Sequence, residues 1–394
     1  MTEAPRALIH VHHLLGVGHL RRALALARGL AAAGAEVTLA SGGMKVPNLP
    51  TAGLDFVQLP PARAKDATFR ELLDETGAEV DEAWRMRRRQ ALLALFAARR
   101  PHLVVTELYP FGRRLLRFEL EPLLSEVRAR AARPIMACSL RDIIHPPAPT
   151  RIQGIVELVR GSFDLVLVHA DPALIDLDLS FPAVPRIADR LHYTGYLLEQ
   201  PVPPAGVADR EPEVIVSSGG GAVGEPLLRT ALAARALSRY RDRPWRLLAG
   251  HNLPEATFQA LRRQAGPGVA VERAREDFVA LLPGALCSVS QAGYNTAIEV
   301  LSAGVPAVFV PFSDAGEMEQ TLRCHALAER ALCRWLPPQN LAPAALAAAI
   351  DAAKPRPEGF SVDMRGAEAS ATLLLRAVGE QATFAPHLHQ ARER

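Results

Sequence analysis

Short apolar runs alternate with amphipathic segments along the whole chain, and glycine-rich turns separate many of them. The first run covers residues 7–12. A segment with helical periodicity then extends from about 20 to 33 and stops at Gly34, a natural C-terminal cap. This alternation is typical of parallel sheets covered by helices. Further strands are predicted at 36–41, 56–59, 103–106, 135–139, 165–168, 192–193, 213–217, 246–249, 269–272, 285–289 and 307–310.

The plan of strand, glycine turn and helix occurs in both halves of the chain. Between the halves lies a proline-rich segment with the composition of a stiff linker, which we place at 201–212. A chain of 394 residues is long enough for two domains that each bury a core. We therefore predict an α/β protein with an N-terminal domain over 1–200 and a C-terminal domain over 213–380, followed by a disordered tail over 381–394.

Composition narrows the class of protein. A hydrophobic content of 49% with 22% charged residues is ordinary for a globular enzyme, and a net charge of +3 is too small to indicate nucleic-acid binding. The four cysteines lack the C-x-x-C spacing of zinc sites. No apolar run reaches the roughly 18–20 residues that cross a bilayer, and the first strand leaves no room for a signal peptide. We expect a cytoplasmic protein.

The segment 287–312 carries the clearest functional signal: a short apolar strand, a polar turn, a helix and a second buried strand. A helix start attracts anions, because free backbone N–H groups and the positive end of the helix dipole coincide there. Glu299 lies about one turn into the helix, where its carboxylate can accept hydrogen bonds from hydroxyls. Phosphate at the turn and a polyol beside it suit a nucleotide diphosphate sugar. The candidate residues of the 290–296 turn are Ser290, Gln291, Ala292, Gly293, Asn295 and Thr296.

Two other glycine-rich turns follow predicted strands. Gly219, Gly220 and Gly221 let backbone N–H groups approach a pyrophosphate, although a flexible connector would have the same composition. In the first turn, Gly16 and Gly18 precede His19, at the sheet edge where open α/β proteins bind ligands. With a reference pKa of about 6.5, His19 is a candidate general base; the alternative is a histidine that only bonds to backbone.

Other polar residues at strand ends are weaker candidates. Glu107 is an alternative general base, and Arg113 and Arg141 are candidates to hold an anionic acceptor, although surface ion pairs are common at such positions. His13 is a candidate to line the same cleft as His19. His10, His12 and His13 lack a recognised ligand spacing, so we predict no metal site.

Residues 214–336, and more weakly the first forty, resemble glycosyltransferases of the GT-B architecture. The resemblance is to the peptidoglycan N-acetylglucosaminyltransferase family and to related bacterial predicted glycosyltransferases. It implies two Rossmann-like domains facing across a cleft, with a last helix near 365–378 that crosses back to the first domain. It also implies that Glu299 binds the nucleotide ribose. The 273–278 loop, which contains Arg275, would lie beside the nucleobase. His251 would line the cleft, and Glu319 with Gln320 would contact the sugar, with Glu317 as the alternative to Glu319.

The function predicted from these features is transfer of a sugar from a nucleotide diphosphate sugar, UDP-linked by resemblance, to an acceptor hydroxyl. Inversion and independence of metal are expected, with no cofactor beyond the donor. The residues identify neither the acceptor nor the oligomeric state. The alternatives are a nucleotide-sugar hydrolase or epimerase on the same fold, which would act without an acceptor, and a noncatalytic nucleotide-sugar-binding subunit, which would bind UDP without turnover.

The basic amphipathic segment 84–100 leaves a membrane contact open. Its arginines would suit anionic lipid at the inner membrane surface. We favour the simpler interpretation, in which the Leu and Phe side chains pack on the sheet and the arginines lie in water.

Overall fold

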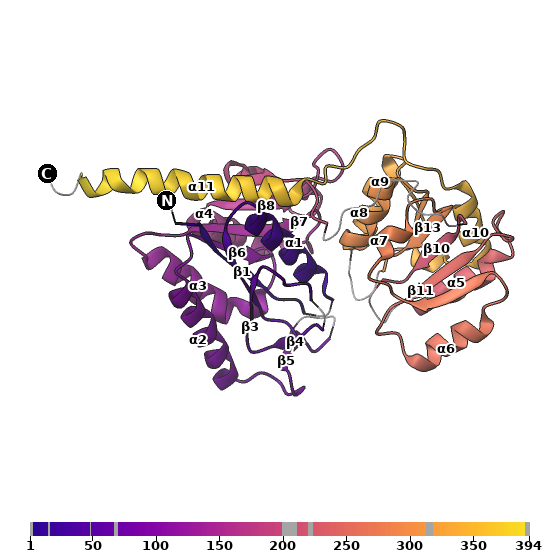
Figure 1. Ribbon diagram of the computed structural model, residues 1–394, viewed down its shortest axis with the longest axis horizontal. Helices are drawn as coiled ribbons and strands as arrows, with labels where there is room; N and C mark the ends of the chain where they lie inside the picture. Colours follow the sequence, from indigo (N-terminus) through magenta and orange to yellow (C-terminus); the bar gives the residue numbers. More distant parts are fainter. Residues whose placement is uncertain are drawn as a thin grey trace. The chain divides into compact units, whose positions relative to one another are not determined.

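The computed structural model describes residues 3–14, 16–47, 49–66, 70–198, 211–219, 224–312 and 318–390. The chain forms two compact units (Figure 1). The N-terminal unit comprises Met1–Glu199 and Asp363–Arg394, and the C-terminal unit comprises Gln200–Val362. Most of the predicted linker, 201–210, lies outside the described residues.

The N-terminal unit is built on a seven-stranded parallel sheet with the strand order β3-β2-β1-β6-β7-β8-β9. The order reverses between β1 and β6, which is the topological switch point where open α/β sheets bind ligands. The strands are β1 (Arg6–Val11), β2 (Glu36–Ser41), β3 (Asp55–Gln58), β6 (Leu103–Glu107), β7 (Ile135–Arg141), β8 (Leu165–His169) and β9 (Leu191–Tyr193). The helices are α1 (Gly18–Ala32), α2 (Glu82–Arg99), α3 (Arg117–Ala129), α4 (Pro149–Ser162) and α11 (Gly366–Gln390), with 3₁₀ turns at Arg114–Leu116, Leu177–Leu179, Val184–Arg186 and Ala188–Arg190.

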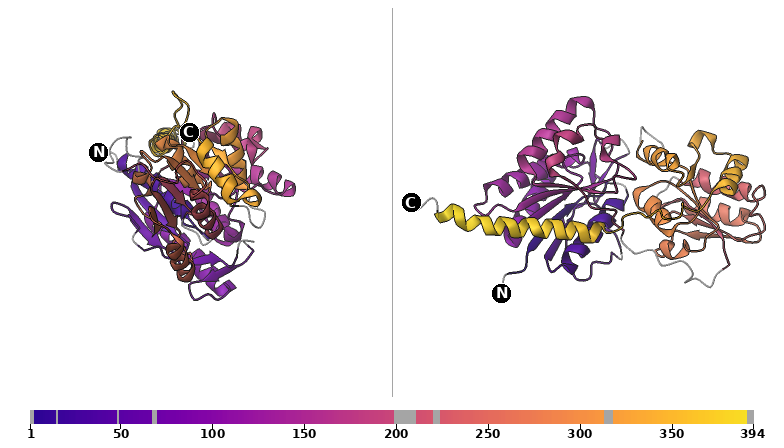
Figure 2. Two further views of the ribbon diagram at one scale, coloured as in Figure 1. Left: turned by 90° about the vertical axis from the view of Figure 1, so that its right-hand side faces the viewer. Right: turned by 90° about the horizontal axis from the view of Figure 1, so that it is seen from above.

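One face of this sheet is covered by α1 and α11. Alternate strand residues such as Ile9, Val105 and Leu167 form an apolar core with both helices. The helices approach so closely that a Cβ at Gly29 would lie 2.7 Å from the backbone oxygen of Ala367. Helix α11 runs along the N-terminal unit in the right-hand view of Figure 2, so the end of the chain returns to the first domain.

The C-terminal unit has a six-stranded parallel sheet in the order β12-β11-β10-β13-β14-β15. This is the doubly wound Rossmann order, with its switch point between β10 and β13. The strands are β10 (Val214–Ser217), β11 (Trp245–Ala249), β12 (Val269–Arg273), β13 (Cys287–Ser290), β14 (Ala307–Phe309) and β15 (Arg334–Trp335). The helices are α5 (Glu225–Arg235), α6 (Glu255–Gln264), α7 (Phe278–Leu281), α8 (Tyr294–Ala303), α9 (Glu319–Glu329) and α10 (Pro343–Ala352), with a 3₁₀ turn at Pro338–Asn340.

Three features differ from the sequence predictions. The antiparallel pair β4 (Ala62–Ala64) and β5 (Leu72–Asp74) and the edge strand β15 were not predicted, because strands of two or three residues have no readable period. The disordered tail expected from 381 also differs from the structure, because α11 continues as a helix to Gln390.

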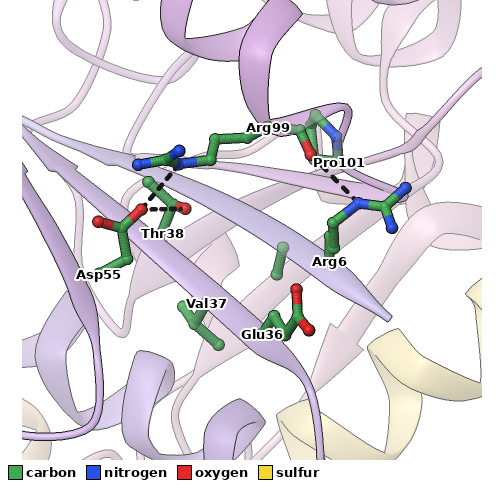
Figure 3. A pocket seen from close by; sticks show the side chains of 8 residues that line it. Arg6, Glu36, Val37, Thr38, Asp55, Arg99 and Pro101 are labelled. Atoms are coloured by element: carbon green, nitrogen blue, oxygen red, sulfur yellow. Dashed lines mark hydrogen bonds and ion pairs between the residues drawn. The ribbon is translucent and has the colours of Figure 1, made fainter. Parts of the chain in front are cut away.

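A pocket of about 280 Å³ opens at the amino ends of β1, β2 and β3 (Figure 3). Part of its lining is engaged within the protein: Arg99 Nε donates to Asp55 Oδ2 at 2.8 Å, and the Thr38 hydroxyl donates to the same oxygen. The pocket lies at the opposite end of the strands from the switch point.

Candidate active site

The N-terminal switch point brings together His19 and Glu107. His19 lies in the first turn of α1, and Glu107 is the last residue of β6. His19 Nδ1 is 2.9 Å from Glu107 Oε1, and the imidazole side chain is 15% exposed. The two predicted catalytic residues are thus a hydrogen-bonded pair rather than alternatives separated in space.

Glu107 is unsuited to act as the base. Its side chain is fully buried, and it forms an ion pair with Arg22, which is itself buried. Burial favours the neutral carboxyl, but Arg22 and the hydrogen bond from His19 outweigh burial and hold the pKa of Glu107 well below its usual range. An ionised, enclosed carboxylate is a weak proton acceptor at neutral pH. Glu107 instead orients His19.

The same contacts define the protonation of His19. Burial and the nearby Arg113 lower the pKa of His19 well below 6.5, although Glu107 opposes them, so the imidazole is neutral at pH 7. Arg22 Nη2 also lies 3.0 Å from Nδ1, but an ionised carboxylate only accepts hydrogen bonds, so the 2.9 Å contact with Glu107 favours the tautomer with the ring proton on Nδ1. In that tautomer Nε2 keeps its lone pair, as a general base requires.

A cationic group borders this pair. Arg113 follows β6 with φ 61°, a left-handed conformation that is uncommon for a side chain other than glycine, and Leu108 has φ 68°. Arg113 Nε is buried without a hydrogen-bond partner among the described residues. Burial lowers the pKa of Arg113 to about 10; Glu107 opposes this shift, and Arg141 and Arg22 reinforce it. Arg113 is still charged at neutral pH.

The remaining candidates of this unit lie around the same edge. Arg141 is half-buried at the end of β7. His13 is buried, and its Nδ1 has no hydrogen-bond partner among the described residues. Gly16 is exposed and Gly18 begins α1.

Sequence reasoning missed His169 at this edge, and in the segment 139–142 it singled out Arg141 rather than Ser139. Ser139 Oγ donates to Glu107 Oε2 at 2.7 Å and lies 2.9 Å from His169 Nε2. Glu107, Ser139 and His169 are polar residues at or near the end of a strand. In each strand the residues two and four positions earlier, which share the same face of the sheet, are apolar. A polar residue that follows apolar residues at alternate positions of a strand is a signal that the sequence does contain.

The buried His169 predicts acid sensitivity. Burial lowers the pKa of His169 to about 3, so below its unfolded value of 6.5 the unfolded state binds a proton that the folded state does not. Stability should therefore fall as pH decreases from 6.5, by up to about 1.4 kcal/mol per pH unit for this group. Urea unfolding across this range should give a shallower pH dependence for His169→Asn than for the wild type. Equal slopes would contradict a neutral, buried His169.

At the C-terminal switch point, the ends of β10 and β13 lie side by side, with Ser217 opposite Ser290. Gly219 has φ 69°, and a Cβ there would lie 3.9 Å from Gln291 Oε1, so the two loops approach each other. Ser290 is fully buried, and its hydroxyl has no hydrogen-bond partner among the described residues. Gly293 precedes α8, with no other atom within 4 Å of its would-be Cβ. The predicted strand, turn and helix are all present.

Side chains of helix α9 form hydrogen bonds to the backbone of the 290–296 turn. Gln320 Oε1 accepts hydrogen bonds from Ala292 N at 3.1 Å and Phe312 N at 2.9 Å. The buried Arg323 donates to Ala292 O at 2.6 Å and pairs with Glu319 at 2.9 Å. Arg323 was not predicted, although its i,i+4 spacing from Glu319 is readable. In this structure Glu319 and Gln320 are engaged in positioning the turn.

The other donor-side candidates are more exposed. Arg275 pairs with Asp277 through two contacts of 2.8 Å, and His251 is exposed in the turn after β11. The half-buried residues of the turn and helix are Gln291, Asn295, Thr296 and Glu299. Gly220, Gly221 and Glu317 lie outside the described residues.

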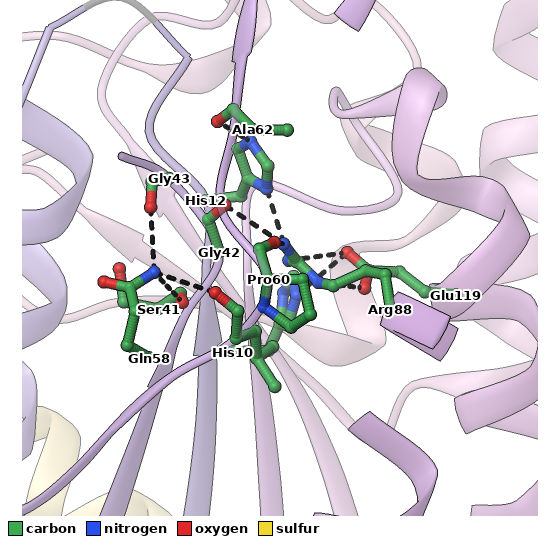
Figure 4. Close-up of polar contacts among 11 residues, drawn as sticks. His10, His12, Ser41, Gly42, Gly43, Gln58, Pro60, Ala62, Arg88 and Glu119 are labelled. Carbon is green, nitrogen blue, oxygen red and sulfur yellow. Dashed lines mark hydrogen bonds and ion pairs between the residues drawn. The ribbon is translucent and has the colours of Figure 1, made fainter. Parts of the chain in front are cut away.

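The opposite face of the N-terminal sheet carries a second buried polar cluster (Figure 4). Arg88 Nε lies 2.7 Å from Glu119 Oε2, and both side chains are fully buried. His10 Nε2 is 3.3 Å from Glu119 Oε1, and His12 Nε2 bonds to Ala62 O. A Cβ at Gly42 would overlap the Arg88 guanidinium. These histidines therefore belong to a network that joins α2 and α3 to β1.

Helix α2 corrects one expectation about the basic segment. Trp84, Arg88, Leu92 and Phe96 form its buried stripe, so Arg88 does not lie in water. Arg85 and Arg87 are exposed. Within the described part of the chain, no helix is long and apolar enough to span a membrane.

Comparison with known proteins agrees with this architecture. Residues 258–372 match the glycosyltransferase family 28 C-terminal domain. A UDP-N-acetylglucosamine–N-acetylmuramyl-(pentapeptide) pyrophosphoryl-undecaprenol N-acetylglucosamine transferase of Albidiferax ferrireducens is 29% identical over 170 residues, covering 41% of this chain and 42% of that protein. The enzyme of the same name from Ralstonia nicotianae is 32% identical over 154 residues, covering 37% and 41%. The alignments thus span less than half of either relative.

Among solved structures, the crystal structure of Acinetobacter baumannii MurG matches over 98% of this chain and 100% of its own, with a TM-score of 0.57 and 16% identity. Two Rossmann-like units define the GT-B class of fold, as predicted. Residues 258–372 are thus similar to the glycosyltransferase family 28 C-terminal domain, and the predicted resemblance to the peptidoglycan N-acetylglucosaminyltransferase family is confirmed.

Proposed function

We propose that this protein transfers a sugar from a nucleotide diphosphate sugar to an acceptor hydroxyl, in a single displacement that inverts the anomeric centre. The observation that carries the proposal is the 2.9 Å contact between His19 Nδ1 and Glu107 Oε1 at the switch point of the N-terminal sheet. This contact supplies an oriented neutral base in a chain that also has a family 28 C-terminal domain.

In the proposed reaction, His19 Nε2 removes the proton of the acceptor hydroxyl as its oxygen attacks the anomeric carbon. The bond from that carbon to the diphosphate breaks, and the electron pair remains on the diphosphate. Glu107 stabilises the imidazolium as it forms. Arg113, whose Nε has no hydrogen-bond partner in the described part of the chain, is suited to contact an anionic group of the acceptor.

The donor is proposed to bind to the C-terminal unit. The start of α8 and the loop at Gly219 would hold the diphosphate, and the buried hydroxyl of Ser290 is a further donor to it. Glu299 would accept hydrogen bonds from the ribose. UDP is proposed as the nucleotide, since both named relatives use UDP-N-acetylglucosamine by their names.

Replacing Glu299 by alanine should weaken UDP binding by about 10- to 100-fold, the loss of hydrogen bonds to a charged group. Thermal unfolding in a UDP titration measures this, because a bound nucleotide raises the melting temperature. Glu358→Ala, at an exposed position of the same unit, is the matched control and should bind as the wild type does. Unchanged affinity in Glu299→Ala would refute the ribose assignment, and the absence of any nucleotide-induced shift in the wild type would refute the donor proposal.

Metal independence is part of the proposal, because backbone amides at the helix start can stabilise the departing diphosphate. Adding EDTA in excess over divalent ions should leave the rate of UDP release unchanged. Loss of turnover that returns with Mg²⁺ would instead assign the leaving-group role to a cation.

A further inference from the structure

A line of buried polar side chains continues from Glu107 away from His19. Ser139 Oγ is 2.7 Å from Glu107 Oε2, His169 Nε2 is 2.9 Å from Ser139 Oγ, and His169 Nδ1 is 2.9 Å from Thr194 Oγ1. All four residues are at most 4% exposed. They lie at or near the carboxyl ends of β6, β7 and β8 and directly after β9.

The proton positions along this line follow from one another. Glu107 is ionised and can only accept, so Ser139 must donate its single hydroxyl proton to Oε2. Ser139 Oγ then accepts from His169, which places the His169 proton on Nε2. His169 is neutral, because burial lowers its pKa to about 3, so Nδ1 is bare and accepts from the Thr194 hydroxyl.

The two carboxylate oxygens of Glu107 thus have different hydrogen-bond partners. Oε1 accepts from His19 and Arg22, and Oε2 accepts from Ser139. Hydrogen bonds to both oxygens determine the plane of the carboxylate, as a partner on one oxygen alone would not. The orientation of that plane decides whether Oε1 faces His19 Nδ1.

We propose that Ser139 and His169 are positioning residues that hold the Glu107 carboxylate so that His19 carries its proton on Nδ1 and keeps Nε2 free. The proposal rests on the proposed function of His19 as the base. Its direct consequence, a single tautomer of His19, holds in the protein without any substrate.

The tautomer can be observed by NMR of protein labelled with ¹⁵N at histidine, in long-range ¹H–¹⁵N correlations. The signals that disappear in His19→Gln are those of His19. In the wild type, Nδ1 should have the shift of a protonated ring nitrogen and Nε2 that of an unprotonated one. In Ser139→Ala the two shifts should move toward each other, and Ser139→Thr, which keeps the hydroxyl, should restore them. His169→Gln should move them in the same direction as Ser139→Ala.

Kinetics provide the second readout. Ser139→Ala should lower kcat by about 10-fold or more and leave the KM for the donor unchanged, as for outer partners that orient functional histidines. Ser180→Ala removes another buried hydroxyl of the same unit, one that accepts a hydrogen bond from Ile144 N. This variant should change neither the His19 shifts nor kcat.

Wild-type His19 shifts that persist in both Ser139→Ala and His169→Gln would overturn the proposal. Failure of the proposed function is a distinct result: His19 would show the Nδ1–H tautomer and its dependence on Ser139, yet His19→Gln would leave turnover unchanged.

Discussion

Replacing His19 by glutamine is expected to lower kcat for sugar transfer by about 10²–10⁴-fold, the usual contribution of a general base. Glutamine retains a polar side chain but cannot accept the proton of the acceptor hydroxyl at Nε2. The rate of UDP release in the presence of an acceptor that supports turnover measures the effect. Because His19 belongs to the N-terminal unit, the affinity for UDP should not change.

The pH dependence provides an independent check of the same residue. The base must be neutral, and burial lowers the pKa of His19 well below 6.5. The rate of the wild type should therefore stay level as pH falls through 6.5 and decline only at lower pH. A half-maximal rate at pH 6.5 or above, or full activity in His19→Gln, would contradict the assignment.

Arg88→Met is expected to destabilise the N-terminal unit by about 3–5 kcal/mol, because it leaves the carboxylate of Glu119 buried without its ion-pair partner. Arg88 also donates to Gly42 O at 3.0 Å, so α2 would lose its link to the loop after β2. Calorimetric unfolding measures the change.

Two variants make this test specific. Arg87→Met alters the exposed neighbour on the same helix and should change stability by no more than about 0.5 kcal/mol. Arg88→Met combined with Glu119→Leu removes both charges and should recover much of the loss. A change in Arg88→Met as small as that in Arg87→Met would show that the pair is not buried.

The strands and the 290–296 turn were predictable because their signals are local. An apolar run followed by glycine and then a helical period needs no information from elsewhere in the chain, which is why β1, α1 and β13–α8 appear close to their expected bounds. The Glu319–Arg323 pair has the same local character, since i,i+4 residues share a helix face.

The contacts of the candidate site are of another kind. Glu107, Ser139 and His169 come from three strands, and only the parallel register of β6, β7 and β8 makes them neighbours. In the sequence, Arg88 is indistinguishable from the other arginines of a basic helix. Its burial depends on its ion pair with Glu119, which lies on another helix.

The residue pattern alone thus determined the α/β class, the repeated strand–turn–helix plan and the position of the helix start proposed to bind the diphosphate, because each follows from spacing along a few consecutive residues. Only the tertiary structure decided which histidines have carboxylate partners, which arginines are buried and which side chains hold the proposed catalytic pair. Those outcomes depend on the exclusion of water around groups distant in the chain, and burial of this kind sets their charges and hydrogen bonds.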